Sequence, residues 1–298
     1  MAEPEIFSPA RPGEPAPRPD ILRPAIDDLA PDVVVERGLI VRLAETTWLR
    51  RVAVVVVLGV IWEVYARQLA NPLMFPSLTE TLEAFVAGLR SGALVSAVSG
   101  SLRILLVGYG VAVVLSTLIT ALAIGTRIGT DVLSTLTSMF NPLPAIAILP
   151  LAMLWFGLGV GSVVFVIVHS VLWAVSLNTL TGFQSVSATQ RMVGRNYGLK
   201  GFAFVRAILI PAAFPAILSG LKIGWAFSWR TLIAAELVFG VSGGAAGLGW
   251  YIFQNRNALE TPNVFAGLLT VIVIGLLVEG VVFRAIESAT IRRWGMQA

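Results

Sequence analysis

Four polar side chains stand inside long apolar stretches of this sequence, where ordinary structural roles are few. They are His169, Asn178, Arg230 and Glu236. Polar and charged groups are costly in apolar surroundings, so each indicates a partner or a function. His169 and Asn178 could line a path for a solute, and Arg230 could present its charge to an anion or pair with a carboxylate. Glu236 stands six residues after Arg230, off its helix face, and favours a packing or gating hydrogen bond. For His169 the alternative is a buried histidine satisfied by a neighbouring helix.

Prolines interrupt one of the apolar stretches. Pro142, Pro144 and Pro150 fall within an otherwise apolar run. Proline lacks a backbone donor and disrupts a helix, and irregular backbone at membrane depth is tolerated only where it faces protein or a cavity. Pro142 and Pro144 are therefore further candidates for a pathway or gate.

The composition excludes most catalytic and metal chemistry within the chain. There is no cysteine and one histidine, which argues against thiol nucleophiles and clustered metal ligands. The two lysines, Lys200 and Lys222, lie outside any Gly-rich phosphate-binding motif, so we expect no ATP site and no cofactor in this chain. The Gly-x-Ser-Gly sequence at 240–243 raises an intramembrane serine protease as an alternative, although a Gly-rich turn explains Ser242 fully.

The elements that position these side chains are predicted to be membrane-spanning helices. Of the 298 residues, 56% are hydrophobic and 13% are charged, whereas a soluble protein has about 25% charged residues. An unusually apolar soluble helical protein is the alternative. Six apolar runs are close to the roughly 20 residues that a helix needs to cross a bilayer, and none alternates as barrel strands do. They cover about 52–69, 104–124, 132–156, 163–180, 212–239 and 264–283.

Basic residues orient the six predicted helices. They gather at 42–51, 127, 191–206 and 284–293, while the opposite side holds only Arg67, Arg90, Arg103 and Arg256. The positive-inside rule then predicts both termini in the cytoplasm, for a multi-pass protein of the bacterial inner membrane. The net charge of +4 is explained by this topology, and no nucleic-acid partner is expected.

Residues 1–47 differ from the rest of the chain. Eight of the sixteen prolines fall between Pro4 and Pro31, among acidic residues and arginines. Such a segment cannot form a packed core, so we expect a largely disordered cytoplasmic tail before a transmembrane domain over 48–298.

A short helix is predicted in the outer connection at 71–98. Ser77 or Thr79 could cap it, and Leu82, Phe85 and Leu89 would lie on one face.

The longest cytoplasmic connection, residues 181–206, combines basic side chains with apolar ones at helical spacing. The apolar set is Met192, Val193, Tyr197, Leu199, Phe202 and Phe204. A basic amphipathic segment of this kind suits docking into a groove on another protein. On these residues alone, an ordinary loop between helices is the alternative.

This connection also carries a spaced motif, formed by Met192, Val193, Gly194, Gly198, Ile208, Ile210 and Pro211. It resembles the EAA loop of binding-protein-dependent ABC importer permeases, whose pattern is Glu-Ala-Ala, three residues, Gly, nine residues and Ile-x-Leu-Pro. Every anchor keeps its spacing, although Met192 replaces the glutamate and the next two residues replace the alanines. Segments at 141–150, 155–159, 215–224, 234–236 and 247–249 resemble the nitrate, sulfonate and taurine subgroup in the same order.

The resemblance implies an all-α type I ABC importer permease with six transmembrane helices, passing a small anion. It implies a homodimer that works with two ATP-binding cassette subunits, which bind ATP and Mg²⁺, and with an external substrate-binding protein that docks near 71–98 and 242–262. The motif would be a coupling helix seated on the ATPase. Gly198 would permit a tight turn or a close approach, and Pro211 would lie in the first turn of the next span.

An ion-coupled secondary transporter is the main alternative function. Such proteins typically contain paired inverted repeats with matching broken helices. One broken run, the third, is visible here without a counterpart, which favours the permease interpretation.

Overall fold

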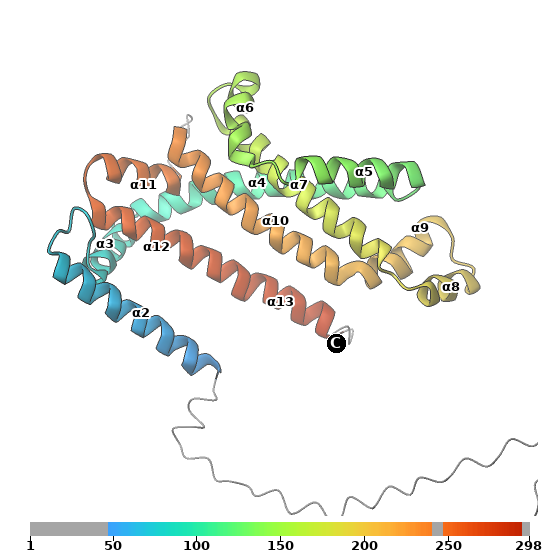
Figure 1. Ribbon diagram of the computed structural model, residues 1–298, viewed down its shortest axis with the longest axis horizontal. Helices are drawn as coiled ribbons and strands as arrows, with labels where there is room; N and C mark the ends of the chain where they lie inside the picture. The colour runs from blue at the N-terminus through green and yellow to red at the C-terminus, as the bar shows by residue number, and fades with distance from the viewer. Residues whose placement is uncertain (1–46, 240–246, 294–298) are drawn as a thin grey trace, which may run out of the picture. The chain divides into compact units, whose positions relative to one another are not determined.

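The computed structural model describes residues 47–239 and 247–293, and the regular structure in these ranges is helical (Figure 1). The predicted tail lies outside these ranges except for its last residue. Contacts divide the chain into two units that meet between Val56 and Val57. Of the first unit only the beginning of helix α2 (Thr47–Leu69) is described, and residues 50–56 there are exposed. The contacts given below lie within the second unit.

Five helical stretches are long and apolar enough to cross a membrane. They are residues 48–69 of α2, α4 (Ala93–Ala123), α7 (Val160–Gln184), Gly201–Val238 and Thr261–Ile291. The predicted interruption of the third run is confirmed, because α5 (Arg127–Phe140) meets the following helical segment at a bend of 86°. That segment consists of the 3-10 turn η2 (Ala145–Ile148) and α6 (Leu149–Phe156). The bent pair provides the sixth span if it counts as one, so the predicted helical membrane fold is confirmed.

Helix α4 begins earlier than the predicted start near residue 104. Its first turns carry Ser96, Ser99 and Ser101, which interrupt the apolar run without interrupting the helix. Serine is only mildly unfavourable in a helix, and hydropathy alone therefore misplaces this boundary.

Two of the spans are composite. The first consists of α9 (Gly201–Phe204), the π-helical turn η3 (Val205–Leu209) and α10 (Ile210–Phe239). Pro211 lies one residue inside α10 and has no N–H group to continue the α-helical ladder, which accounts for a wide π turn immediately before it. The second composite span consists of α12 (Thr261–Leu277), η4 (Val278–Phe283), α13 (Arg284–Glu287) and η5 (Ser288–Arg292).

Helices α4, α7 and α10 form the packed centre of the second unit (Figure 1). The core there includes Leu105, Ile167 and Leu232. Helices α7 and α10 come close together, because a Cβ atom on Gly220 would lie only 2.7 Å from the Cβ of Asn178. Small residues at such crossings let transmembrane helices exploit van der Waals packing, which drives their association in lipid.

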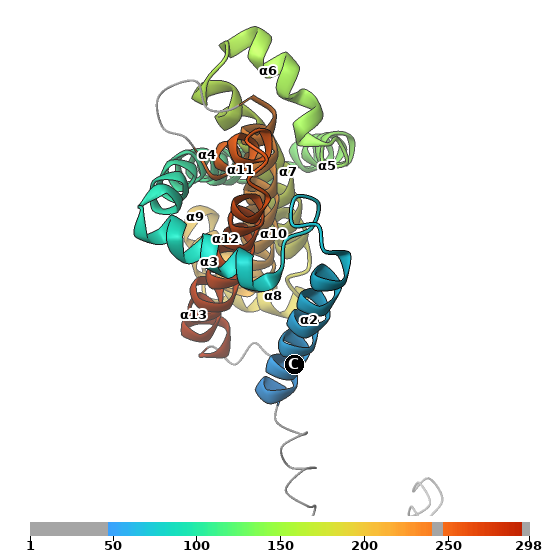
Figure 2. The ribbon, with the colours of Figure 1, turned by 90° about the vertical axis from the view of Figure 1, so that its left-hand side faces the viewer.

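The connection between α2 and α4 contains the predicted short helix, α3 (Leu78–Arg90). Ser77 Oγ accepts from the Glu80 N–H at 3.1 Å, and the Glu80 carboxylate accepts from the Ser77 N–H at 2.8 Å. This capping box fixes where the helix starts. Helix α3 packs across α12 (Figure 2). Phe85 packs against the core while Leu82 and Leu89 are exposed, so the three residues predicted on one face have different surroundings.

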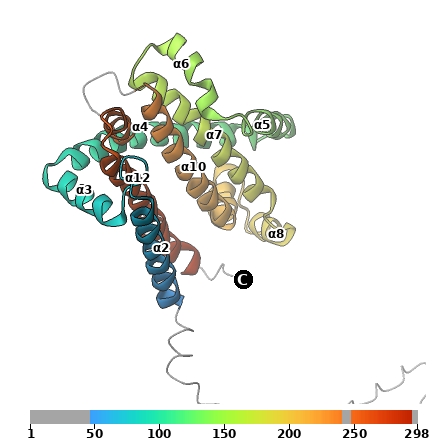
Figure 3. The ribbon, with the colours of Figure 1, turned by 60° about the vertical axis from the view of Figure 1, so that its left-hand side comes forward.

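Two further helices lie at opposite ends of α10. Helix α8 (Ala188–Asn196) lies beyond one end of α7 and α10 (Figure 3). Helix α11 (Leu248–Asn257) lies near the other end of α10 (Figure 1). Ser242 of the protease alternative lies outside the described residues.

Candidate functional site

Helix α8 is fastened to the end of α7 by its own side chains. Ser187 caps its first turn by accepting from the Gln190 N–H at 3.2 Å. Arg191 donates through Nη2 to the Phe183 carbonyl at 2.6 Å and through Nε to the Val186 carbonyl at 3.1 Å. A cation that binds the free carbonyls at a helix C-terminus also interacts favourably with the helix dipole. Helices α7 and α8 are therefore joined by more than the backbone.

The structure gives a different reason for glycine at each of two positions in the motif. Gly194 is buried, and a Cβ there would lie 2.8 Å from both Ile208 Cγ1 and Phe204 Cε2. Gly198 has a φ of +74° and open space around it, and its N–H donates to the Arg195 carbonyl at 2.9 Å. Gly194 thus permits the close approach of α8 to η3, while Gly198 ends α8 in a left-handed turn.

The hairpin formed by α8 and α9 exposes large apolar residues on the side that faces away from α7 and α10. We define the α8 patch as Met192, Val193, Tyr197 and Phe202. Met192 is 61% exposed and Tyr197 is 82% exposed, and the basic residues Arg195 and Lys200 are exposed beside them. A groove of about 260 Å³ runs next to the patch, lined by Thr189, Gln190, Val193, Ala207, Ile208, Pro211 and Ala212. The predicted loop residues are thus brought together, with Ile210 partly exposed at the start of α10.

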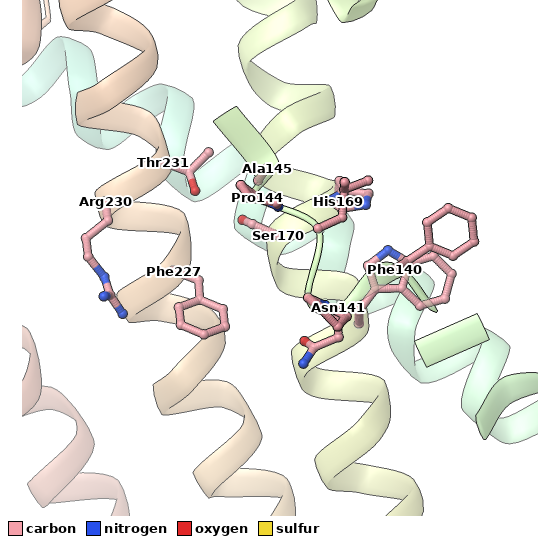
Figure 4. Close-up of a pocket in the computed structure, with 12 residues that line it drawn as sticks. Phe140, Asn141, Pro144, Ala145, His169, Ser170, Phe227, Arg230 and Thr231 are labelled. Atoms are coloured by element: carbon pink, nitrogen blue, oxygen red, sulfur yellow. The ribbon is translucent and has the colours of Figure 1, made fainter. Parts of the chain in front are cut away.

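A second candidate site is the cavity where the α5–α6 break meets α7 and α10, with a volume of about 260 Å³ (Figure 4). We call it the break cavity. Four of the predicted pathway residues line it, namely Pro142, Pro144, His169 and Arg230. Its remaining lining is Phe140, Asn141, Leu143, Ala145, Ser170, Trp173, Phe227 and Thr231.

The polar groups of the break cavity are incompletely paired. Neither ring nitrogen of His169 has a hydrogen-bond partner among the described residues, and the same is true of Trp173 Nε1. Arg230 Nε donates to the Ala226 carbonyl at 3.1 Å, and the guanidinium carbon lies 5.2 Å from the centre of the Phe227 ring. The expected alternative of a histidine satisfied by a neighbouring helix is therefore wrong within the described residues.

Asn178 does not line the break cavity. Its Nδ2 donates to the Ala174 carbonyl of its own helix at 2.8 Å, and its Cβ packs where α7 and α10 cross closely beside Gly220. Its position is that of a packing residue between two central helices.

Glu236 is fully buried and joins three helices. Ser101 Oγ of α4 lies 2.9 and 2.8 Å from the two carboxylate oxygens and donates to them, and it accepts from the Leu248 N–H at 2.8 Å. The Gly249 N–H donates to Glu236 Oε2 at 2.8 Å. Of the first N–H groups of α11, that of Leu248 is thereby satisfied by the Ser101 hydroxyl and that of Gly249 by a carboxylate from α10, which a helix N-terminus favours. We call this group the Glu236 cluster.

Sequence reasoning missed Ser101 and Trp173. Ser101 lies between the predicted connection at 71–98 and the predicted start of the next span near residue 104, so it received no role. Trp173 stands in an apolar run, where nothing distinguishes a cavity-lining tryptophan from one in contact with lipid. In the described ranges no group of three acidic, histidine or cysteine side chains could hold a metal ion.

Comparison with known proteins adds independent information. Residues 112–290 match the family described as "Binding-protein-dependent transport system inner membrane component". The chain is 30% identical to the taurine transport system permease protein of Escherichia coli over 234 residues, which is 75% of this chain and 82% of that protein. It is 31% identical to the nitrate import permease protein of Synechocystis over 184 residues, which is 60% of this chain and 64% of that protein.

Proposed function

Because the chain belongs to the family of binding-protein-dependent transport system inner membrane components, a multi-pass family of ABC importer permeases, we propose that it conducts a small anion and is driven through α8. Membership of this family decides against the two alternatives raised by the sequence, a secondary transporter and an intramembrane protease. The finer parts of the proposal concern the ATPase contact, the assembly, the orientation and the solute.

The α8 patch is the observation that carries the ATPase contact. Four large apolar side chains exposed together on a basic hairpin are unusual for a surface in water, and they suit insertion into a groove on a partner. We propose that the partner is an ATP-binding cassette subunit and that it binds ATP and Mg²⁺. The motif residues from Met192 to Pro211 form the coupling element.

The contacts of α8 supply a mechanism for energy transfer. Arg191 holds α8 to the end of α7, and Gly194 packs it against η3, which leads into α10. A pull on α8 is therefore transmitted to the two helices that line the break cavity. Closure of two ATPase subunits would move α7 and α10 as docked rigid elements and open a passage.

The assembly and orientation follow from this placement of α8. If the ATPase contact is cytoplasmic, both termini are cytoplasmic in the inner membrane, and α3 and α11 lie at the outer surface. An external substrate-binding protein then docks near 71–98 and 242–262, of which residues 240–246 lie outside the described ranges. The permease works as a homodimer with two ATPase subunits.

The solute is a small anion such as a sulfonate or nitrate. Two relatives are named for taurine and nitrate. In this chain the break cavity contains one formal positive charge, on Arg230, and no acidic side chain. His169, Pro142 and Pro144 share the cavity and are proposed to line the path with it.

A matched pair of methionine substitutions tests the ATPase contact. Met192 and Met74 are 61% and 71% exposed, so an aspartate at either position costs little folding energy. With the ATP-binding subunit from the same gene cluster co-expressed, Met192→Asp should abolish co-purification or coupled ATP hydrolysis in nanodiscs, because it places a charge in an apolar interface. Met74→Asp, between α2 and α3 on the side proposed for the binding protein, should leave co-purification with the ATPase unchanged. Equal behaviour of the two variants, or a wild-type chain that binds no ATPase, contradicts the proposal.

A further inference from the structure

Glu279 is a charged side chain inside the last span, and the proposed function gives it no role. It is exposed in the π turn η4, twelve residues before the end of the span at Ile291. Among the described residues, its carboxylate has no hydrogen-bond or ion-pair partner. Charged groups within membrane spans almost always face the protein interior and pair with one another. A partner for Glu279 is therefore expected from a neighbouring helix.

Arg230 and Glu279 line the same groove. The groove lies between α10 and the span formed by α12 and η4, and its volume is about 490 Å³. We call it the α10–α12 groove. Its third charged lining residue is Lys222, which already pairs with Glu287 at 2.7 Å. Within the described ranges Arg230 and Glu279 form no ion pair, although they are the two opposite charges left in this groove.

The pair Lys222–Glu287 shows how the two spans are aligned. They run side by side in opposite chain directions (Figure 1). Arg230 follows Lys222 by eight residues, and Glu279 precedes Glu287 by eight. At 1.5 Å per residue both displacements are about 12 Å in the same direction, so Arg230 and Glu279 reach the same level.

Two other features support this alignment. Between the two charged levels, the rings of Trp225 and Phe283 meet with centroids 6.5 Å apart. Two α-helical turns take roughly 7 residues, so a spacing of eight overshoots one helix face slightly. The π turn η4 uses more residues per turn, which brings Glu279 back toward the face of Glu287.

Arg230 stands between two cavities. It lines the break cavity on one side and the α10–α12 groove on the other. Its Nε donates to the Ala226 carbonyl, and its guanidinium lies beside the Phe227 ring. These contacts hold the side chain along α10 and leave both terminal nitrogens able to donate. A small rotation of α10 about its axis would exchange the break cavity for Glu279.

The two walls of the groove are attached to different parts of the molecule. Helix α10 continues from η3, against which Gly194 packs the coupling hairpin. Helix α12 packs instead on α3 and α11. Long side chains connect the walls, as where Trp229 Nε1 donates to the Val271 carbonyl at 3.3 Å. Movement of the hairpin therefore acts on one wall of the groove before the other.

We propose that Glu279 is a positioning residue that captures Arg230 in the resting state of the transporter. With the passage closed, Arg230 and Glu279 form an ion pair across the α10–α12 groove, and the guanidinium is withdrawn from the break cavity. Movement of α10 breaks the pair and gives the unpaired arrangement described here. The switch rests on the proposed function, because it requires that ATPase closure moves α10.

Double-mutant cycles in the permease–ATPase complex test the switch. Arg230→Gln and Glu279→Gln each remove a charge with little change of shape, and the Tm of each variant is measured in nanodiscs. In the nucleotide-free complex, the double variant should melt about 2 °C or more above the temperature expected from adding the two single changes. In the complex trapped with ATP and vanadate, the changes should be additive, because the pair is open.

A second carboxylate on the same span provides the control. Glu287 already pairs with Lys222, so Arg230→Gln and Glu287→Gln should be additive in both states. Additive changes for Arg230 and Glu279 in both states overturn the switch. Equal coupling in both states indicates a permanent ion pair, and coupling in the trapped complex alone gives the opposite direction, so either result also overturns it.

Exchange of the two charges covers the case in which a neutral variant does not assemble. Arg230→Glu and Glu279→Arg each place like charges across the groove and should lower the yield of co-purified complex. The double exchange should restore that yield at least in part. A yield that stays as low as in the single variants overturns the pair.

Thiol crosslinking excludes a pair formed between two copies of the chain. The sequence contains no cysteine, so Arg230→Cys with Glu279→Cys supplies the only thiols of the permease. A short bismaleimide should join them within one chain. A covalent dimer that forms with both cysteines, and with neither alone, places the contact between copies and overturns the proposal.

The outcomes separate the switch from the proposed function. Coupling between Arg230 and Glu279 in the nucleotide-free complex does not depend on ATP hydrolysis. If it is found while Met192→Asp has no effect, the pair stands and the coupling proposal falls. If Met192→Asp uncouples the ATPase while the cycle is additive in both states, the proposed function stands and the switch falls.

Discussion

At the scale of single residues, the same side-chain types have different roles according to what surrounds them. Arg230 and Glu236 are six residues apart on one helix, yet Arg230 is exposed to the break cavity and Glu236 is fully buried against α4 and α11. The carboxylate is stabilised by the Ser101 hydroxyl and a helix N-terminus and needs no cation. The guanidinium lacks a described carboxylate and remains available to a ligand.

The Glu236 cluster gives a prediction about stability. Glu236→Ala removes the acceptor for the Gly249 N–H and the Ser101 hydroxyl and leaves a void in a packed interior. Each unsatisfied buried donor costs about 1–3 kcal/mol, so we expect a loss of about 2–5 kcal/mol in the free energy of unfolding. Thermal denaturation of the purified permease–ATPase complex should show a clearly lower Tm.

The control for this prediction is Glu83→Ala. Glu83 is exposed on α3, and removal of an exposed carboxylate changes stability by about 0.5 kcal/mol or less. If both alanine variants melt at the wild-type temperature, the Glu236 cluster does not stabilise the fold.

At the scale of elements, the connection between α7 and α10 forms a single packed unit. Arg191 binds the end of α7, Gly194 packs on η3, and Gly198 turns the chain back toward α9. The π turn before Pro211 joins this body to α10 without a loop. An ordinary flexible connection could not transmit force between helices, whereas this one is packed on both sides.

The two glycines of this hairpin should respond differently to substitution. Gly194→Val forces α8 away from Ile208 and Phe204, and we expect loss of at least about 90% of coupled ATP hydrolysis because the docking geometry is lost. Gly198→Asn should retain most of the activity, because asparagine tolerates the left-handed conformation and the space around Gly198 is open. Nanodisc ATPase assays of both variants check this. A functional Gly194→Val protein would show that α8 need not pack on η3.

At the scale of the whole second unit, function is arranged along α10. Helix α8 lies beyond one end of α10 and α11 lies near the other (Figure 1). Along α10 itself, Arg230 precedes Glu236, which binds the start of α11. A helix of this length is long enough to cross a bilayer. The ATPase contact and the binding-protein contact are therefore expected on opposite sides of the membrane, with the break cavity between them.

Thiol labelling tests this orientation, and the absence of cysteine from the sequence makes single-cysteine variants unambiguous. Met74→Cys should react with a membrane-impermeant maleimide in intact spheroplasts. Tyr197→Cys, at a position 82% exposed on the α8 patch, should react only after permeabilisation in cells that lack the ATPase subunit, because the patch is proposed to be cytoplasmic and covered by that subunit in the complex. The parent chain should remain unlabelled. The reverse pattern would place the α8 patch outside and contradict the ATPase contact.

The amino-acid sequence alone determined the membrane class, the helical runs and the spacing of the motif at 192–211. These depend on properties that are local along the chain. Apolar length decides whether a helix can cross a bilayer, and the positions of Gly198 and Pro211 fix where one helix ends and the next begins. The proline interruption of the third run was also visible, because Pro142 and Pro144 act on their own backbone.

Only the tertiary structure decided which polar residues meet. Ser101 and Glu236 are 135 residues apart, and no local pattern shows that their side chains are in contact. The separation of Asn178 from His169 and Arg230, and the addition of Trp173 to the break cavity, likewise depend on how α7 rotates against α10. In lipid both faces of a helix are apolar, so periodicity does not reveal which face is buried. Close packing at glycines such as Gly220 sets that rotation.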